Sequence, residues 1–153
     1  MSSNETRNPG RRFQSEGKTT SSGSLTIFVD NDFNEAQPIC AVYSPGDGYL
    51  SVHGKRLKAF LTGFQITNGL PGPEGSKFAN GCGCLAAQVI AHFKQVPGRI
   101  YMHPMPITQD AREAYHYIVT TKSEEPIWLT VDALGEQIYD GPLDSFDPQM
   151  RGV

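Results

Sequence analysis

The pattern of apolar positions is clearest between Cys82 and Gln95, where it predicts an amphipathic helix. At about 100° per residue, the apolar side chains fall on one stripe roughly 140° wide, the width of a helix packed on one side only. The members of this stripe are Cys82, Leu85, Ala86, Val89, Ile90 and Phe93. A loop rich in glycine and proline, residues 68–81, leads into the helix, so we expect free backbone N–H groups beside that loop. Such a helix start favours anions, although an ordinary loop before a core helix has the same pattern.

A second helix is predicted over residues 54–64, because Leu57, Phe60 and Leu61 recur at i, i+3 and i+4. Three basic residues, Lys55, Arg56 and Lys58, follow its expected start. The dipole of a helix disfavours cations in its first turns. This basic cluster therefore indicates either an anionic neighbour or simple solvation.

Alternating apolar and polar residues, many of them β-branched or aromatic, predict short strands in the rest of the chain. The predicted strands are Leu25–Asp30, Pro38–Ser44, Gln65–Asn68, Arg99–His103, Tyr115–Thr121, Ile127–Val131 and one beginning at Gln137–Tyr139. Helices and strands are segregated along the chain rather than strictly alternating. This order predicts an α+β fold, with a mixed or antiparallel sheet of several short strands and two main helices packed on one face.

Composition indicates one domain and restricts its partners. Residues 1–23 are polar and are expected to form a flexible N-terminal arm, followed by a single α+β ligand-binding domain over residues 24–153. A net charge of -3 argues against duplex nucleic acid as a partner, but it is compatible with a local basic pocket. Since there is neither a long apolar run nor a hydrophobic signal core, we expect no membrane association and a cytoplasmic location.

The cysteines and histidines do not form a recognisable site. Cys40, Cys82 and Cys84 give no disulfide framework, as expected in a reducing compartment. A zinc site would need ligands in paired spacing, which these cysteines and the scattered histidines do not provide. We therefore expect no bound metal.

Motifs of the common enzyme classes are also missing. The glycine-rich loop lacks the G-K-[ST] ending of a phosphate-binding P-loop, and neither G-x-G-x-x-G nor G-x-S-x-G occurs. We expect no cofactor, no catalytic residues and no enzymatic activity. Two alternatives stay open: a small nucleotide phosphodiesterase or hydrolase that uses His53 or His92 as general base, and an accessory protein that blocks a host protein.

The remaining features are those of a small-anion pocket. The glycine-rich turns Pro45–Gly48 and Gly69–Gly81 allow a ligand to approach the backbone closely. Arginine is the better bidentate partner for phosphate, aromatic rings can stack on a base, and Asn80 could bond a base edge or a ribose. The basic candidates are Lys55, Arg56, Lys77 and Arg99, and the aromatic ones are Tyr49, Phe78 and Tyr101.

Two segments, GDGYLSVHGKRLKAFLTGFQITNG and FANGCGCLAAQVIAHFKQVPGRIYMHP, carry a resemblance to a known family. They resemble small phage proteins with a GY-x-x-x-HG-x-x-L-x-x-FL segment followed by an NG-x-GCLAAQ helix, the anti-Thoeris proteins. The resemblance covers about residues 25–139. It implies a phage anti-defence sponge that sequesters cyclic ADP-ribose isomers without cleaving them, in the cytoplasm of the infected bacterium.

The resemblance also implies a homo-oligomer built from dimers, a hexamer being one form, with pockets near subunit contacts. Some such sponges hold cyclic oligonucleotides at a separate site. By this resemblance Phe78 and Asn80 contact the base or ribose, and Arg56 and Arg99 hold the phosphates. The expected ligand-binding set is His53, Arg56, Phe78, Asn80, Gly81, Cys82, Arg99 and Tyr101. Leu50 and Val52 replace a Pro and a Gly of the family pattern, which leaves the loop before the first helix, and the role of His53, undetermined.

Overall fold

A computed structural model describes residues 22–69, 73, 75–108, 111 and 113–150, so residues 1–21 of the expected arm lie outside the described part of the chain. Its strands are β1 (Ser24–Asp30), β2 (Gln37–Ser44), β3 (Gln65–Thr67), β4 (Phe78–Asn80), β5 (Tyr101–Met102), β6 (Tyr115–Thr121), β7 (Trp128–Ala133) and β8 (Glu136–Pro142). Its helices are the π-helical turn η2 (Leu50–Gly54), α2 (Lys55–Leu61), α3 (Gly81–Phe93) and the 3-10 turn η3 (Leu143–Ser145).

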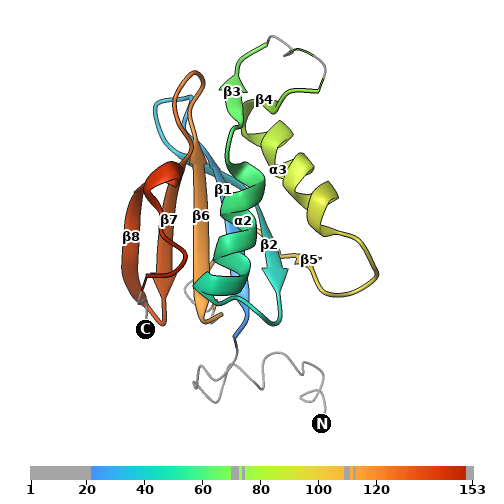
Figure 1. The fold of residues 1–153 in the computed structure, drawn as a ribbon, viewed down its shortest axis with the longest axis vertical. Coiled ribbons are helices and arrows are strands. Elements are labelled where there is room, and N and C mark those ends of the chain that lie inside the picture. Colours follow the sequence, from blue (N-terminus) through green and yellow to red (C-terminus); the bar gives the residue numbers. More distant parts are fainter. Residues whose placement is uncertain (1–21, 70–72, 74, 109–110, 112, 151–153) are drawn as a thin grey trace.

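The described strands form one six-stranded sheet in the order β5-β2-β1-β6-β7-β8 and a separate pair, β3-β4 (Figure 1). Within the large sheet, β1 runs parallel to β6, and the other neighbours are antiparallel. Both α2 and α3 lie on the same face of this sheet (Figure 1). The predicted α+β class, with a mixed sheet and two helices on one face, is confirmed.

The core lies between the helices and the central strands. Along β6 every second residue is buried, and Tyr117 and Val119 have no exposed surface on the helix side. The apolar stripe of α3 is confirmed, because Leu85, Ala86 and Val89 are buried against the same cluster. Burying each large aliphatic side chain stabilises the fold by about 1.5–3 kcal/mol. The packing of α3 therefore fixes which of its residues remain available for a site.

The helical segment before β3 starts earlier than the sequence indicated. Helical turns begin at Leu50 in η2 and continue into α2, so Lys55 and Arg56 follow a preceding turn instead of opening the helix. At the other end, the Lys77 Nζ donates to the carbonyl oxygens of Phe60 at 2.9 Å and Thr62 at 2.8 Å. A cation at this position suits the negative end of the helix dipole.

Strand β4 was not predicted, since its three residues follow a glycine-rich segment and pair only with β3, which is distant in sequence. The predicted strand at Arg99–His103 shortens to the two residues of β5. Among the described residues, no helix is long and apolar enough to cross a membrane.

Candidate functional site

A pocket of about 570 Å³ opens between the helices and the β1-β2 side of the sheet. This volume lies in the range typical of small-molecule sites. Its walls come from four segments: strands β1 and β2, the turn after β2, the η2-α2 segment, and the end of α3 with the loop that follows. The lining residues are Thr26, Val42, Ser44, Pro45, Gly46, Asp47, His53, Arg56, Val89, Ile90, Phe93, Gln95, Val96, Arg99 and Ile100.

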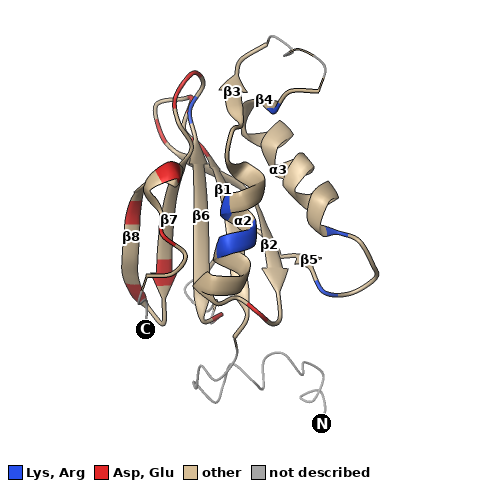
Figure 2. Cartoon of the chain, in the orientation of Figure 1, with Lys and Arg blue, Asp and Glu red and all other residues tan. Residues whose placement is uncertain are grey.

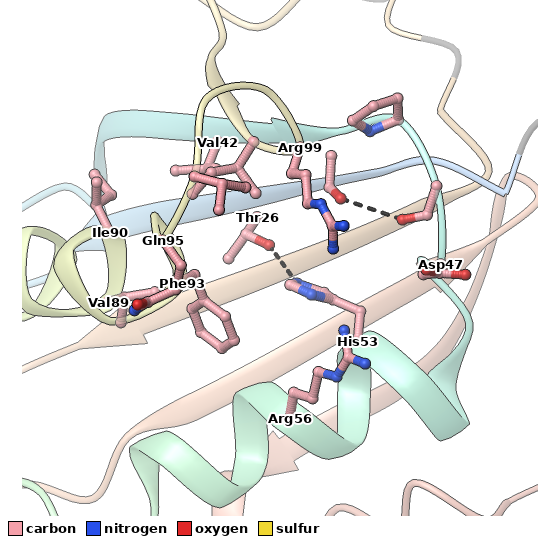
Figure 3. Close-up of a pocket in the computed structure, with 15 residues that line it drawn as sticks. Thr26, Val42, Asp47, His53, Arg56, Val89, Ile90, Phe93, Gln95 and Arg99 are labelled. Carbon is pink, nitrogen blue, oxygen red and sulfur yellow. Dashed lines mark hydrogen bonds between the residues drawn. The ribbon is translucent and has the colours of Figure 1, made fainter.

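The pocket has an apolar end and a polar end (Figure 3). At the apolar end, the labelled side chains are Val42, Val89, Ile90 and Phe93, mainly from α3. At the polar end, Arg99 from the loop after α3 points toward His53, and Arg56 lies on the α2 side of the same ring. The two arginines thus approach the cavity from different elements.

Neither arginine is neutralised within the described part of the chain. No carboxylate described by the structure lies at ion-pair distance from Arg56 or Arg99, and Asp47 is the single carboxylate among the residues that line the pocket. Two guanidinium groups without a carboxylate partner make a favourable place for an anion, because arginine binds phosphate through bidentate charge-assisted hydrogen bonds.

His53 is held as a neutral ring. Its Nε2 lies 2.8 Å from the hydroxyl oxygen of Thr26, and its ring meets that of Tyr117 edge-on at 4.8 Å between centroids. Burial lowers the pKa of His53 to about 4, and the positive charge of Arg56 acts in the same direction. The imidazole is therefore uncharged near pH 7, and the positive charge of the pocket comes from the arginines.

Two residues on the pocket wall have a backbone conformation that L-amino acids seldom adopt. Asp47, in the turn after β2, has a φ of 59°, and Arg99, in the loop after α3, has a φ of 72°. Among the described residues, the other two non-glycine residues with a positive φ are Glu124 and Leu134, which lie in the turns after β6 and β7, where this conformation is common. Strained backbone often marks functional sites, so this observation supports the pocket as one.

Charge is distributed unevenly over the molecule (Figure 2). Lysine and arginine residues lie on α2 and in the loop after α3, whereas acidic residues lie on β7 and β8 and in several turns, including the pocket-lining Asp47. Positive charge is thus concentrated in one region of the molecule, although the net charge of the chain is -3.

Three residues of the expected ligand-binding set, His53, Arg56 and Arg99, come together in this pocket. The turn Pro45–Gly48, singled out for its glycines, contributes Pro45, Gly46 and Asp47 to the wall. Leu50 and Val52 belong to the π-helical turn that also carries His53. Single π-helical turns occur often at functional sites.

The pocket that contains Arg56 and Arg99 does not include the start of α3, which the sequence indicated as a favourable place for an anion. The pocket lies beside Val89, Ile90 and Phe93, in the C-terminal half of α3, because the turn after the helix folds Arg99 back against that end. Four members of the expected set lie instead around the N-terminal end of α3 and do not line the pocket: Phe78, Asn80, Gly81 and Cys82.

The local contacts at that end are structural. The Asn80 Oδ1 accepts a hydrogen bond from the Gly69 N–H at 2.6 Å, and the Phe78 carbonyl accepts one from the Gln88 Nε2 at 2.9 Å. Cys82 is 1% exposed, and burial raises the pKa of its thiol to about 11. A ligand role for these residues stays a prediction, separate from this pocket.

The other candidates also point elsewhere. Tyr101 is exposed on β5, 6.2 Å from the ring of Tyr43, and it does not line the pocket. Tyr49 packs edge-on against Tyr115 at 5.9 Å. Lys77 bonds the end of α2, as described above.

Several pocket residues were not anticipated as site residues. Thr26 lies in the middle of an apolar strand, and Val89, Ile90 and Phe93 were assigned only to the packed face of α3. The apolar stripe of α3 is wide, and its members Ile90 and Phe93 are only half-buried by the core. Part of this stripe is therefore available to line a pocket. Asp47 gave no signal beyond its position between two glycines.

Within the part of the chain that the structure describes, no group of three or more His, Cys, Asp or Glu side chains is arranged to hold a metal ion. The three cysteines are free. Comparisons with protein-family models, with curated proteins and with solved structures found no match to this chain.

Proposed function

We propose that this protein binds a cyclic nucleotide signal, of the cyclic ADP-ribose class that the sequence resemblance implies, and sequesters it without cleavage. The observation that carries this proposal is the pair Arg56 and Arg99, which face one pocket from two elements with no carboxylate partner among the described residues. A diphosphate bound between them would satisfy both guanidinium groups.

The two ends of the pocket support a ligand with two different parts. Phosphate oxygens suit the end that holds the arginines. The opposite end, with Val42, Ile90 and Phe93, suits the flat apolar face of a base. A nucleotide carries both parts, whereas inorganic phosphate would leave the apolar end in contact with water.

The state of His53 supports binding without turnover. A general base works best when its pKa lies near the operating pH, and His53, with a pKa of about 4, accepts a proton poorly at pH 7. The Ser44 hydroxyl donates to the Gly46 carbonyl at 3.2 Å and is therefore directed toward the backbone. His92 stacks on Phe60 at 4.2 Å and does not line the pocket.

One contact favours the alternative of a hydrolase. The 2.8 Å between the Thr26 Oγ1 and the His53 Nε2 is also the distance of a nucleophile and its base. Thr26 is only 3% exposed, which restricts its access to a substrate. The two functions differ in what they release, so one experiment separates them.

Purified protein is incubated with cyclic ADP-ribose, separated from unbound nucleotide and heat-denatured, and the supernatant is analysed by mass spectrometry. Recovery of intact cyclic ADP-ribose in proportion to protein supports sequestration. Recovery of linear ADP-ribose supports the hydrolase, and a Thr26→Val variant that retains intact ligand would then identify the nucleophile. If no nucleotide is retained by the wild-type protein, the proposal fails for this ligand class.

As part of the same proposal, the protein acts in the cytoplasm of an infected bacterium and assembles as a homo-oligomer of dimers. The edge strand β5 supports assembly, because Tyr101 and Met102 are about half exposed there, at 51% and 57%. Exposed apolar side chains on a sheet edge are a common contact between copies of a chain.

A further inference from the structure

The loop that carries Arg99 contains a turn with a strained backbone conformation. The Ile100 N–H donates to the Gly98 carbonyl at 2.8 Å, which closes a three-residue γ-turn centred on Arg99. With a φ of 72° at Arg99, this is the rare, strained form of the γ-turn. Because Arg99 and Ile100 both line the pocket, the turn determines where the guanidinium lies.

One side chain, that of Lys94, bonds both sides of this turn. Its Nζ donates to the Gly98 carbonyl at 2.8 Å and to the Ile100 carbonyl at 2.9 Å, and it lies 5.6 Å from the centre of the Tyr101 ring. The backbone N–H of Lys94 in turn donates to the Ile90 carbonyl at 2.8 Å, at the end of α3. Lys94 thus connects a rigid helix to the two carbonyls that flank Arg99.

We infer that Lys94 is a positioning residue for the ligand site: it holds the strained turn so that Arg99 points into the pocket toward His53. This inference rests on the proposed function for its consequence in binding. Lys94 does not line the pocket, so its role passes through Arg99 rather than through contact with the ligand.

The test measures binding of cyclic ADP-ribose by calorimetry in a double-mutant cycle. Lys94→Met is expected to weaken binding about five- to tenfold in the wild-type background, and less than about twofold when Arg99 is already Ala. Lys94→Arg retains the charge and the donors, so it is expected to restore most of the affinity. Lys55→Met removes the same charge next to Arg56 and measures the purely electrostatic part.

A second measurement needs no nucleotide. Trypsin cleaves after arginine, and a loosened loop is cleaved faster. In the full chain, Lys94→Met is expected to speed cleavage of the Arg99–Ile100 bond several-fold, with cleavage after Lys55 or Lys122 unchanged. If the wild-type protein binds no cyclic ADP-ribose, the proposed function fails, while faster cleavage at Arg99 still supports Lys94 as the residue that holds the turn.

Unchanged cleavage at Arg99 would overturn the inference. So would equal losses of affinity from Lys94→Met in the wild-type and Arg99→Ala backgrounds, since Lys94 would then act by charge alone.

Discussion

Arg56 and Arg99 belong to different elements, yet both line the same cavity. Replacing either by Ala is expected to weaken cyclic ADP-ribose binding by about 1.5–3 kcal/mol, roughly 10- to 150-fold, because a charge-assisted hydrogen bond is lost. Calorimetric titration of each variant measures this loss.

Lys55→Ala is the matched control for this pair, since Lys55 is a neighbouring cation outside the pocket lining. Its affinity is expected to stay within about twofold of the wild type. A loss at Lys55 as large as that at Arg56 would mean that general charge attracts the ligand, without a defined phosphate contact.

His53 gives the molecule a pH-dependent stability. The pKa of His53 is about 4 in the folded protein and near 6.5 in the unfolded chain, so between these values the unfolded chain binds the extra proton. The contribution of His53 to the free energy of unfolding is therefore fully present above pH 6.5 and is lost as the pH falls toward 4. Thermal denaturation at pH 7.0 and pH 4.5 is expected to show a lower melting temperature at the acidic pH.

The variant His53→Asn isolates this contribution. Burial also lowers the pKa of His116, which adds a loss of stability in the same direction, so the variant is expected to reduce the difference between the two pH values without removing it. An unchanged difference would show that His53 does not titrate as described.

At the scale of elements, the turn after β2 joins the pocket to the start of β1. The Gly48 N–H donates to the Ser22 carbonyl at 2.7 Å, and the Tyr117 hydroxyl donates to the Gly48 carbonyl at 2.6 Å. A Cβ at position 48 would lie 2.5 Å from that same Ser22 oxygen. The backbone at position 48 therefore has no room for a side chain.

Gly48→Ala is expected to lower the free energy of unfolding by about 1–3 kcal/mol, because the added methyl group must displace the backbone of residues 22–24. Gly46→Ala is the control two residues away, where a Cβ meets nothing within 4 Å. Its free energy of unfolding should change by less than about 0.5 kcal/mol. Urea denaturation compares the two, and equal effects would contradict the close approach at Gly48.

Elements with strong local patterns were predictable, and those that depend on distant partners were not. The stripe from Cys82 to Phe93 and the alternation along Tyr115–Thr121 reflect burial on one face, which a sequence records directly. Strand β4 exists through its pairing with β3, and η2 continues a helix whose periodic apolar residues begin later. Of the four basic candidates, Arg56 and Arg99 line the pocket, together with Pro45, Gly46 and Asp47 of the glycine-rich turn. The position of Arg99 depends on the turn at Gly98–Ile100, which brings it to the C-terminal end of α3. The sequence had indicated the N-terminal end of this helix.

At the scale of the whole molecule, the separation of charge predicts how salt affects binding. Because Arg56 and Arg99 are exposed, their attraction for an anion is screened as the ionic strength rises. Affinity for cyclic ADP-ribose is expected to fall several-fold between about 0.05 and 0.5 M NaCl, where the Debye length shortens from roughly 14 to 4 Å. Titrations across this range measure the effect, and an affinity that rises with salt would indicate binding through the apolar end alone.

Assembly is a separate property of the whole molecule. If copies meet through the exposed edge at β5, Met102→Glu should shift the protein toward a smaller species in light scattering, because a charge would then be buried at the contact. Leu134→Glu, at an equally exposed apolar position after β7, is the control. A wild-type protein that is monomeric at high concentration would contradict the predicted homo-oligomer.

The positive φ of Arg99 favours glycine at this position, whereas the proposed function requires the arginine side chain. Glycine at this position would remove the strain of the positive φ, but it would also lose more chain entropy on folding. These two free-energy terms are about equal, so Arg99→Gly should fold almost as well as the wild type. The stability of the fold therefore does not require an arginine at this position. Under the proposed function, a relative of this chain with glycine or asparagine at this position is expected to keep the fold and to bind cyclic ADP-ribose weakly.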